Sequence, residues 1–179
     1  MKIQYASDIH LELSDNSRFI KSMPFEVAGD VLVFAGDTGY LRDRTLPNLK
    51  FWKWASANYR EVLQVPGNHE FYGNGDVLAY GDSWSREILP NVHYHQNKVV
   101  RIDNTDFILS TLWSHINSAF ATELGDFIAD SRIDVWIYGH SHANIDATVG
   151  NTRIVSNQMG YVYCGEHLQD FKGDKFIEL

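Results

Sequence analysis

Short apolar runs recur along the chain, and most of them have the length and composition of β-strands. Runs of roughly four to eight residues that are apolar or alternating predict strands at 2–6, 31–35, 61–65, 92–95, 97–102, 106–113, 134–138, 145–149 and 152–156. Apolar positions at helical spacing predict helices at 46–59, 76–88 and 119–130. Asn104-Thr105 and Gly150-Asn151 have the composition of hairpin turns. This order predicts an α/β fold with two sheets packed face to face and helices outside.

Polar side chains that commonly bind metals directly follow several of these strands. The clusters are Asp8-Ile9-His10 after 2–6, Gly36-Asp37 after 31–35, Gly67-Asn68-His69-Glu70 after 61–65, and Gly139-His140-Ser141-His142 after 134–138. Open α/β sheets leave a crevice at the carboxyl ends of their strands, where loops converge ligands while the strands stay rigid. The pattern therefore predicts one polar site at one end of a sheet.

The residue types in these clusters indicate a transition-metal site. Aspartate, asparagine and histidine combine hard oxygens with borderline imidazole nitrogens, a set that suits Mn, Fe, Zn, Co or Ni. A single catalytic zinc uses about three protein ligands, fewer than the candidates Asp8, His10, Asp37, Asn68, His140 and His142. A pair of ions roughly 3.5–4 Å apart is the usual means of clamping a phosphoryl group. We therefore expect two divalent metal ions as cofactors, with Mn favoured.

Taken in order, the motifs DIH, GD, GNHE and GHSH resemble those of the calcineurin-like metallophosphoesterase family. The opening from Ile3 to Glu12 looks like that of small bacterial members, and the resemblance extends from Lys2 to about Tyr161. It implies a four-layer αββα sandwich of two mixed β-sheets flanked by helices, in a single domain over residues 1–179. It also implies hydrolysis of phosphomonoesters or phosphodiesters through a dinuclear metal centre and a metal-activated water.

The resemblance, together with ligand chemistry, distributes these side chains over the two ions. Asp37 is expected to bridge them, because a carboxylate has two oxygens that can each bind an ion. The remaining ligands would be Asp8, His10 and His142 on one metal, and Asn68 and His140 on the other. His69 follows Asn68 in the GNH motif and is the candidate general acid for the leaving group. The expected catalytic residues are therefore His69 and Asp37.

The family pattern includes a further histidine ligand between the GNHE and GHSH motifs. His115 is the candidate, because it follows the strand predicted at 106–113. Compared with relatives that share the opening motif, the chain looks shortened around residues 116–119. Either His115 binds the second metal, which is the interpretation we favour, or that metal lacks this histidine.

The acidic composition restricts the classes of partner. The net charge is −8, whereas broad nucleic-acid binding uses clustered Lys and Arg, so nucleic acid is disfavoured and a nuclease ranks third among the functions. A small phosphoester substrate remains compatible, because two divalent ions outweigh the carboxylates of Asp8 and Asp37 locally. The chain has one cysteine, Cys164, which excludes an internal disulfide and fits a reducing compartment.

Targeting signals are also disfavoured by the sequence. No apolar run approaches the roughly 18 residues of a membrane span, and the first strand already leads to the candidate ligand Asp8, which argues against a cleaved signal peptide. We therefore expect a cytoplasmic protein without a membrane partner.

Two classes of function remain open. The first is a dinuclear phosphoesterase, and the second is a phosphoesterase-like scaffold that binds metal weakly and acts by protein contacts. The full set of motif residues favours the enzyme, because a scaffold has no need of them all.

Overall fold

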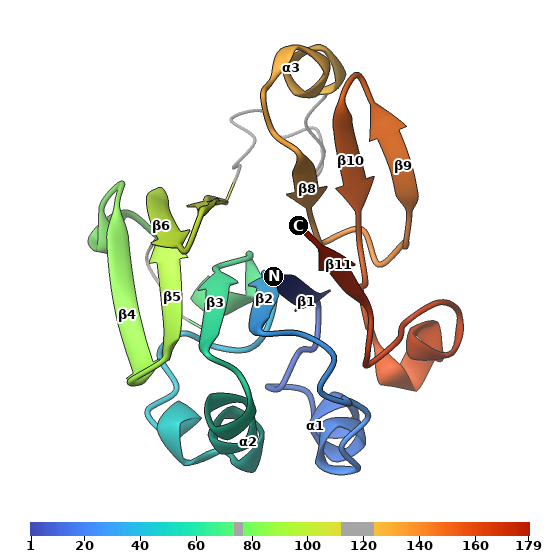
Figure 1. Cartoon of the computed structure of the whole chain (residues 1–179). Helices are drawn as coiled ribbons and strands as arrows, with labels where there is room; N and C mark the ends of the chain where they lie inside the picture. The colour runs from blue at the N-terminus through green and yellow to red at the C-terminus, as the bar shows by residue number, and fades with distance from the viewer. Residues whose placement is uncertain (74–76, 112–123) are drawn as a thin grey trace.

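The computed structural model describes residues 1–73, 77–111 and 124–179, and its largest element is a six-stranded sheet (Figure 1). The strands are β1 (Lys2–Ala6), β2 (Val31–Ala35), β3 (Glu61–Val65), β4 (Trp84–Leu89), β5 (Val92–Gln96) and β11 (Phe176–Glu178). They are ordered β11-β1-β2-β3-β5-β4. The four central strands run parallel, and β11 and β4 pair antiparallel at the two edges. The carboxyl ends of β1, β2 and β3 therefore meet at one end of the sheet.

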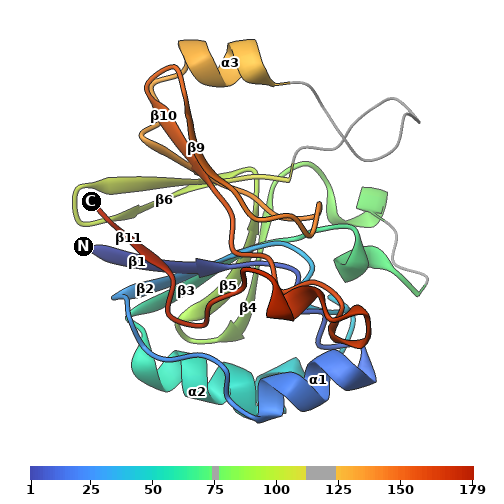
Figure 2. The ribbon, with the colours of Figure 1, turned by 90° about the vertical axis from the view of Figure 1, so that its right-hand side faces the viewer.

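Two smaller sheets form the second β layer (Figure 2). One is the hairpin of β6 (Lys98–Ile102) and β7 (Thr105–Leu109), and the other is ordered β8-β10-β9, with β8 (Val135–Ile137), β9 (Asp146–Val149) and β10 (Thr152–Val155). The core between the layers contains Ile3, Tyr5, Val31, Val33 and Leu63 from the large sheet and Ile102, Phe107, Leu109 and Val155 from the smaller ones. Because successive strand residues face opposite sides, the apolar residues of β1 and β2 contribute to the cores on both faces of the sheet.

Helices cover both outer surfaces. α1 (Ser14–Lys21) and α2 (Lys50–Asn58) lie on the far face of the large sheet, where Ile20 and the fully buried Trp52 pack in a core with Phe34. α3 (Gly125–Asp130) lies over the smaller three-stranded sheet, and the Thr152 hydroxyl of β10 donates to Ile128 O at 3.3 Å. The predicted α/β fold with helices outside two β layers is confirmed (Figure 2). None of the described helices combines the length and apolar character that crossing a bilayer requires.

Short 3-10 helices connect the main elements. They are η1 (Leu46–Asn48), η2 (His69–Phe71), η3 (Val77–Tyr80), η4 (Val162–Cys164) and η5 (Glu166–Leu168). The predicted helix 46–59 is therefore divided into η1 and α2, because Leu49 between them has an extended backbone with ψ 132°. The predicted helix 119–130 is observed as α3, and its residues 119–123 lie outside the described residues.

The helix predicted at 76–88 is wrong. Residues Trp84–Leu89 form β4, an edge strand paired with β5, and only Val77–Tyr80 form a 3-10 turn. The more buried positions in β4 are Trp84, Arg86 and Ile88, which recur every two residues. A strand with one covered face shows this alternation, so the period of two outweighs the helical interpretation. The strand predicted at 106–113 is also shorter than expected, since β7 ends at Leu109.

Candidate metal centre

Segments that are far apart in sequence meet at the carboxyl ends of β1, β2, β3 and β8. The Asp8 N–H donates to Gly36 O and the His10 N–H donates to Asp37 O, each at 3.0 Å, so the loops after β1 and β2 hold each other. The His140 N–H donates to both carboxylate oxygens of Asp8, at 3.0 and 3.1 Å. This contact ties the loop after β8 to the loop after β1. The candidate ligands therefore project from loops that main-chain hydrogen bonds fix in place.

Five of the candidate ligands have a left-handed backbone. Their φ values lie between 45° and 84°, and they are Asp8, His10, Asp37, His140 and His142. A residue with a Cβ adopts this conformation at a cost of about 1–3 kcal/mol, which the surrounding structure must offset. Such strain is typical of functional sites, where a side chain has to point in a direction that regular backbone does not allow. The concentration of strained residues here is therefore a structural sign of function that is independent of the motifs.

Asp8, His10 and His142 form the tighter group. Their ligand atoms all lie within 4.8 Å of one another. His10 Nε2 is 3.3 Å from His142 Nε2, and Asp8 Oδ1 is 3.4 Å from His142 Nε2. Two imidazole nitrogens and a carboxylate oxygen that converge in this way are a donor set suited to one divalent transition-metal ion. The residues present therefore fit a metal at this position.

Asp37 and His140 form a second and more open pair, and Asn68 lies in the loop after β3. The buried carboxylate of Asp37 accepts the His69 N–H on Oδ1 at 2.8 Å, and its Oδ2 lies 3.8 Å from His140 Nδ1. Burial raises the pKa of Asp37, but hydrogen bonds from His140 and His69 outweigh it and lower the pKa below its usual value. Asn68 Nδ2 donates to the Tyr72 hydroxyl at 2.6 Å, which orients the side-chain amide. Asp37 therefore stays ionised between the two groups.

Glu12 is a functional candidate that the motif analysis left without a role. Its Oε1 accepts from His10 Nδ1 at 3.1 Å and from His69 Nδ1 at 2.7 Å, and its side chain is 3% exposed. Burial alone would raise its pKa, but the hydrogen bonds with His10 and His69 lower the pKa to about 2. An ionised carboxylate in this position keeps the proton on Nδ1 of both rings and leaves both Nε2 atoms for function. The only sequence signal for it is its place two residues after His10.

Glu166 supports His142 in the same way from the other side of the site. Its Oε2 accepts from His142 Nδ1 at 2.7 Å and from the Tyr161 N–H at 2.6 Å. Burial lowers the pKa of His142, but contacts with Asp8 and Glu166 outweigh burial and raise it. Gly160 makes this approach feasible, since a Cβ there would lie 2.4 Å from Glu166 Oε2. The sequence carried no signal for Glu166, because it lies beyond every motif.

Glu70 and Gly67 have structural roles. The Glu70 carboxylate accepts the N–H groups of Thr38 (2.7 Å), Gly67 (2.7 Å) and Asp37 (3.1 Å), so it joins the loops after β2 and β3. Burial, reinforced by the charge of Asp37, raises the pKa of Glu70 to about 8. A Cβ on Gly67 would lie 2.3 Å from Asp37 Oδ1, so glycine is needed for Asp37 to keep its position.

The further histidine ligand of the family pattern is not tested by this geometry. His115 lies outside the described residues, and its assignment to the second metal stays a prediction. The other predicted site residues, from Asp8 to His142, all lie within the described residues. All of them except Asn68 contact another predicted site residue as given above, and the role of Asn68 as a ligand stays a prediction.

Comparison with known proteins gives a family match. A family model described as calcineurin-like phosphoesterase matches residues 1–144, a range that contains every motif quoted above. The uncharacterized protein L509 of Acanthamoeba polyphaga mimivirus is 29% identical over an alignment of 146 residues, and the match covers 73% of this chain and 51% of that protein. The chain therefore spans about half the length of this curated relative.

Two solved structures are also similar. A conserved uncharacterized protein of Streptococcus pneumoniae TIGR4, described as a predicted phosphoesterase, aligns with a TM-score of 0.47 and 17% identity over 89% of this chain and 75% of that one. A single mutant of Vps29 from Entamoeba histolytica aligns with a TM-score of 0.47 and 16% identity, over 90% of this chain and 77% of that one.

Proposed function

Because the chain belongs to the calcineurin-like phosphoesterase family, we propose that it hydrolyses small phosphomonoesters or phosphodiesters at a centre of two divalent metal ions. The observation that carries the proposal is the convergence of Asp8, His10 and His142, whose ligand atoms lie within 4.8 Å of one another. Mn is the favoured metal, since the donor set mixes carboxylate and amide oxygens with imidazole. The proposal also includes a single domain and a cytoplasmic location. The one cysteine of the chain supports a reducing compartment.

The proposed ligands divide between the ions according to the two groups. Asp8, His10 and His142 hold the first ion, and Asn68, His140 and His115 hold the second, with Asp37 shared. When bound, the pair of ions would lower the pKa of a water molecule and stabilise the negative charge of the phosphoryl group. Glu12 and Glu166 support this assignment, because their hydrogen bonds to Nδ1 leave Nε2 of His10 and His142 facing the same point.

His69 is the proposed general acid. Its Nδ1 is bound to Glu12, and its Nε2 lies 3.5 Å from the Tyr161 hydroxyl, on the side that faces the centre. Burial lowers its pKa, but the hydrogen bond with Glu12 and the charge of Asp37 outweigh burial and raise the pKa above its usual value. A histidine with a raised pKa carries a proton at neutral pH more often than a free one, which suits protonation of a leaving group.

The test is metal content together with turnover of 4-nitrophenyl phosphate and bis(4-nitrophenyl) phosphate in the presence of Mn. We expect two bound ions per chain and hydrolysis of at least one substrate. Asp8→Asn should weaken both metal binding and turnover, whereas Asp126→Asn on the exposed surface of α3 is the matched control and should change neither. A folded protein that binds no metal and hydrolyses neither ester would contradict the proposal and favour the scaffold instead.

A further inference from the structure

Tyrosine rings gather around His69 at the metal centre. The ring centroids of Tyr72 and Tyr161 lie 4.5 and 6.4 Å from that of His69. Tyr163 stacks on Tyr161, with centroids 5.5 Å apart and an interplanar angle of 25°. None of these tyrosines belongs to a metal-binding motif, so their place beside the proposed general acid calls for a separate explanation.

Two of the three rings are open to solvent. Tyr72 is 45% exposed and Tyr163 is 67% exposed, while the other large exposed aromatic residues among those described, Phe127 and Phe176, lie on α3 and β11. Folding removes apolar rings from water where it can, and scattered exceptions are common. Tyr72 lies directly beside His69, and Tyr163 stacks on Tyr161, the other tyrosine near that histidine, so each exposed ring offers a planar face close to the candidate general acid.

Tyr161 gives this arrangement a rigid base. Its N–H donates to Glu166 Oε2 at 2.6 Å, and its ring centroid lies 4.9 Å from that of His10 and 4.5 Å from that of His142. Because both imidazoles are themselves fixed by carboxylates, the Tyr161 ring has little freedom. Tyr163 therefore stacks on a fixed neighbour, and the aromatic surface is formed before a ligand binds.

We propose that the exposed rings of Tyr72 and Tyr163 bind the leaving group of the substrate, and that this leaving group carries a planar aromatic ring, as in an aryl or nucleoside phosphoester. This inference rests on the proposed function. A leaving oxygen that receives a proton from His69 Nε2 must approach the Tyr161 hydroxyl, which is 3.5 Å from that nitrogen. Tyr72 lies beside the same imidazole and Tyr163 stacks on Tyr161, so both exposed rings are neighbours of groups that the leaving group meets. Stacking of a base on an aromatic side chain is sequence-tolerant and strengthens binding about tenfold or more. The net charge of −8 favours a small ester over a nucleic-acid strand.

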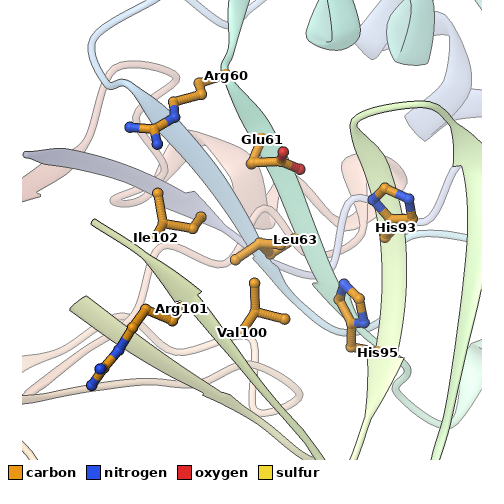
Figure 3. Close-up of a pocket in the computed structure, with 8 residues that line it drawn as sticks. All are labelled: Arg60, Glu61, Leu63, His93, His95, Val100, Arg101 and Ile102. Atoms are coloured by element: carbon orange, nitrogen blue, oxygen red, sulfur yellow. The ribbon is translucent and has the colours of Figure 1, made fainter. Parts of the chain in front are cut away.

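A separate cavity of about 290 Å³ is less suited to an anionic ester (Figure 3). It lies between β3, β5 and β6, and its lining includes Arg60 and Arg101. Both guanidinium groups already donate to carboxylates, Arg60 to Asp103 at 2.7 Å and Arg101 to Asp106 at 2.7 Å. The cavity therefore has its positive charges neutralised, and its lining contains no residue of the metal centre.

The experiment compares adenosine 5′-monophosphate with ribose 5-phosphate, which both lose phosphate from a primary 5-hydroxyl and differ in the adenine ring of the leaving group. With Mn, we expect kcat/KM for the nucleotide to exceed that for the sugar phosphate about tenfold, mostly through KM. Tyr163→Leu removes the ring and should abolish this ratio, whereas Tyr163→Phe keeps the ring and should keep the ratio. Leu168→Ala is the control, because Leu168 is 78% exposed in the same C-terminal segment. A wild-type ratio near one would overturn the inference.

Calorimetric titration of the metal-free protein with adenosine and with ribose, which carry no charge, gives a readout without turnover. We expect adenosine to bind about tenfold more tightly, and Tyr163→Leu to remove the difference. Equal affinity for the two ligands, or binding of neither, would contradict the aromatic site. Selective binding without hydrolysis in Mn would instead contradict the proposed function while leaving the aromatic site in place, so the two failures are distinguishable.

Discussion

The two halves of the candidate metal centre differ in how firmly their side chains are held. In the first half, Asp8 and His10 are fully buried, and the His142 side chain is 15% exposed. In the second half, the His140 side chain is 42% exposed, and its Nδ1 lies 3.8 Å from Asp37 Oδ2. The comparison indicates that Asp8, His10 and His142 are more enclosed by the protein than His140.

Two histidines of the first half contact carboxylates through Nδ1. Glu12 orients His10 and Glu166 orients His142, with Nδ1 to Oε distances of 3.1 and 2.7 Å. Partners of this kind fix the tautomer and ring direction of a ligand, and their removal typically reduces metal affinity or activity about 10–100-fold. We therefore expect the first ion to bind more tightly than the second.

Asp37→Ala should have the largest effect, because it removes the one side chain shared by both halves. Both ions should be lost, and kcat/KM should fall about a thousandfold or more, since the ions supply several kcal/mol of transition-state stabilisation. Asp8→Ala should mainly weaken one ion. Elemental analysis and kinetics on both variants test this, and two ions still bound after Asp37→Ala would rule out a bridging role.

His115→Ala tests the weaker half directly. If this histidine binds the second ion, the variant should retain one ion of two and lose nearly all hydrolysis, because one ion cannot both activate water and clamp the phosphate. In the wild-type protein, the affinity for the second ion should also weaken as the pH falls through the titration of the His115 imidazole. Two ions in both wild type and variant would exclude His115 as a ligand.

His69→Ala separates chemistry from metal binding. Removal of a general acid costs about 10²–10⁴ in rate, so kcat on an alkyl phosphate should fall by that factor while both ions stay bound. The loss should shrink on 4-nitrophenyl phosphate, whose leaving group hardly needs a proton. Equal losses on the two esters, or a lost ion, would argue against the assigned role.

Glu12→Gln should have a smaller effect. We expect it to reduce the affinity for the first ion, or kcat, by about 10–100-fold. Glu166→Gln is the matched comparison, since Glu166 contacts His142 but not His69. Only Glu12→Gln should also lower kcat by a factor that depends on the leaving group of the substrate, because only Glu12 also orients His69. Metal titration and kinetics on the two esters measure both effects. Identical leaving-group dependence in the two variants would contradict the link between Glu12 and the general acid.

The sequence by itself determined the central strands and the places of the motif residues. β1, β2 and β3 are mostly apolar because both of their faces are covered, so local composition is enough to identify them. Asp8, Asp37 and Asn68 follow those strands, and the carboxyl ends of parallel neighbours necessarily meet at one end of the sheet.

Other elements depended on the tertiary structure. β4 is a strand because it pairs with β5 at an edge, which its mixed composition did not reveal. α1 and β11 were not predicted, since a short helix and a three-residue edge strand depend on packing against the sheet more than on their own sequences.

The roles of Glu12, Glu166 and Tyr161 could only come from the folded chain. The segment that carries the latter two runs beside β1, where the Met159 N–H donates to Ser7 O and the Gly160 N–H donates to Asp8 O, each at 3.1 Å. A metal ligand can be recognised in the sequence because the same residue types occur after several strands. A residue that orients a ligand needs only a hydrogen-bond acceptor within about 3 Å, and that acceptor can come from any segment that folding brings near.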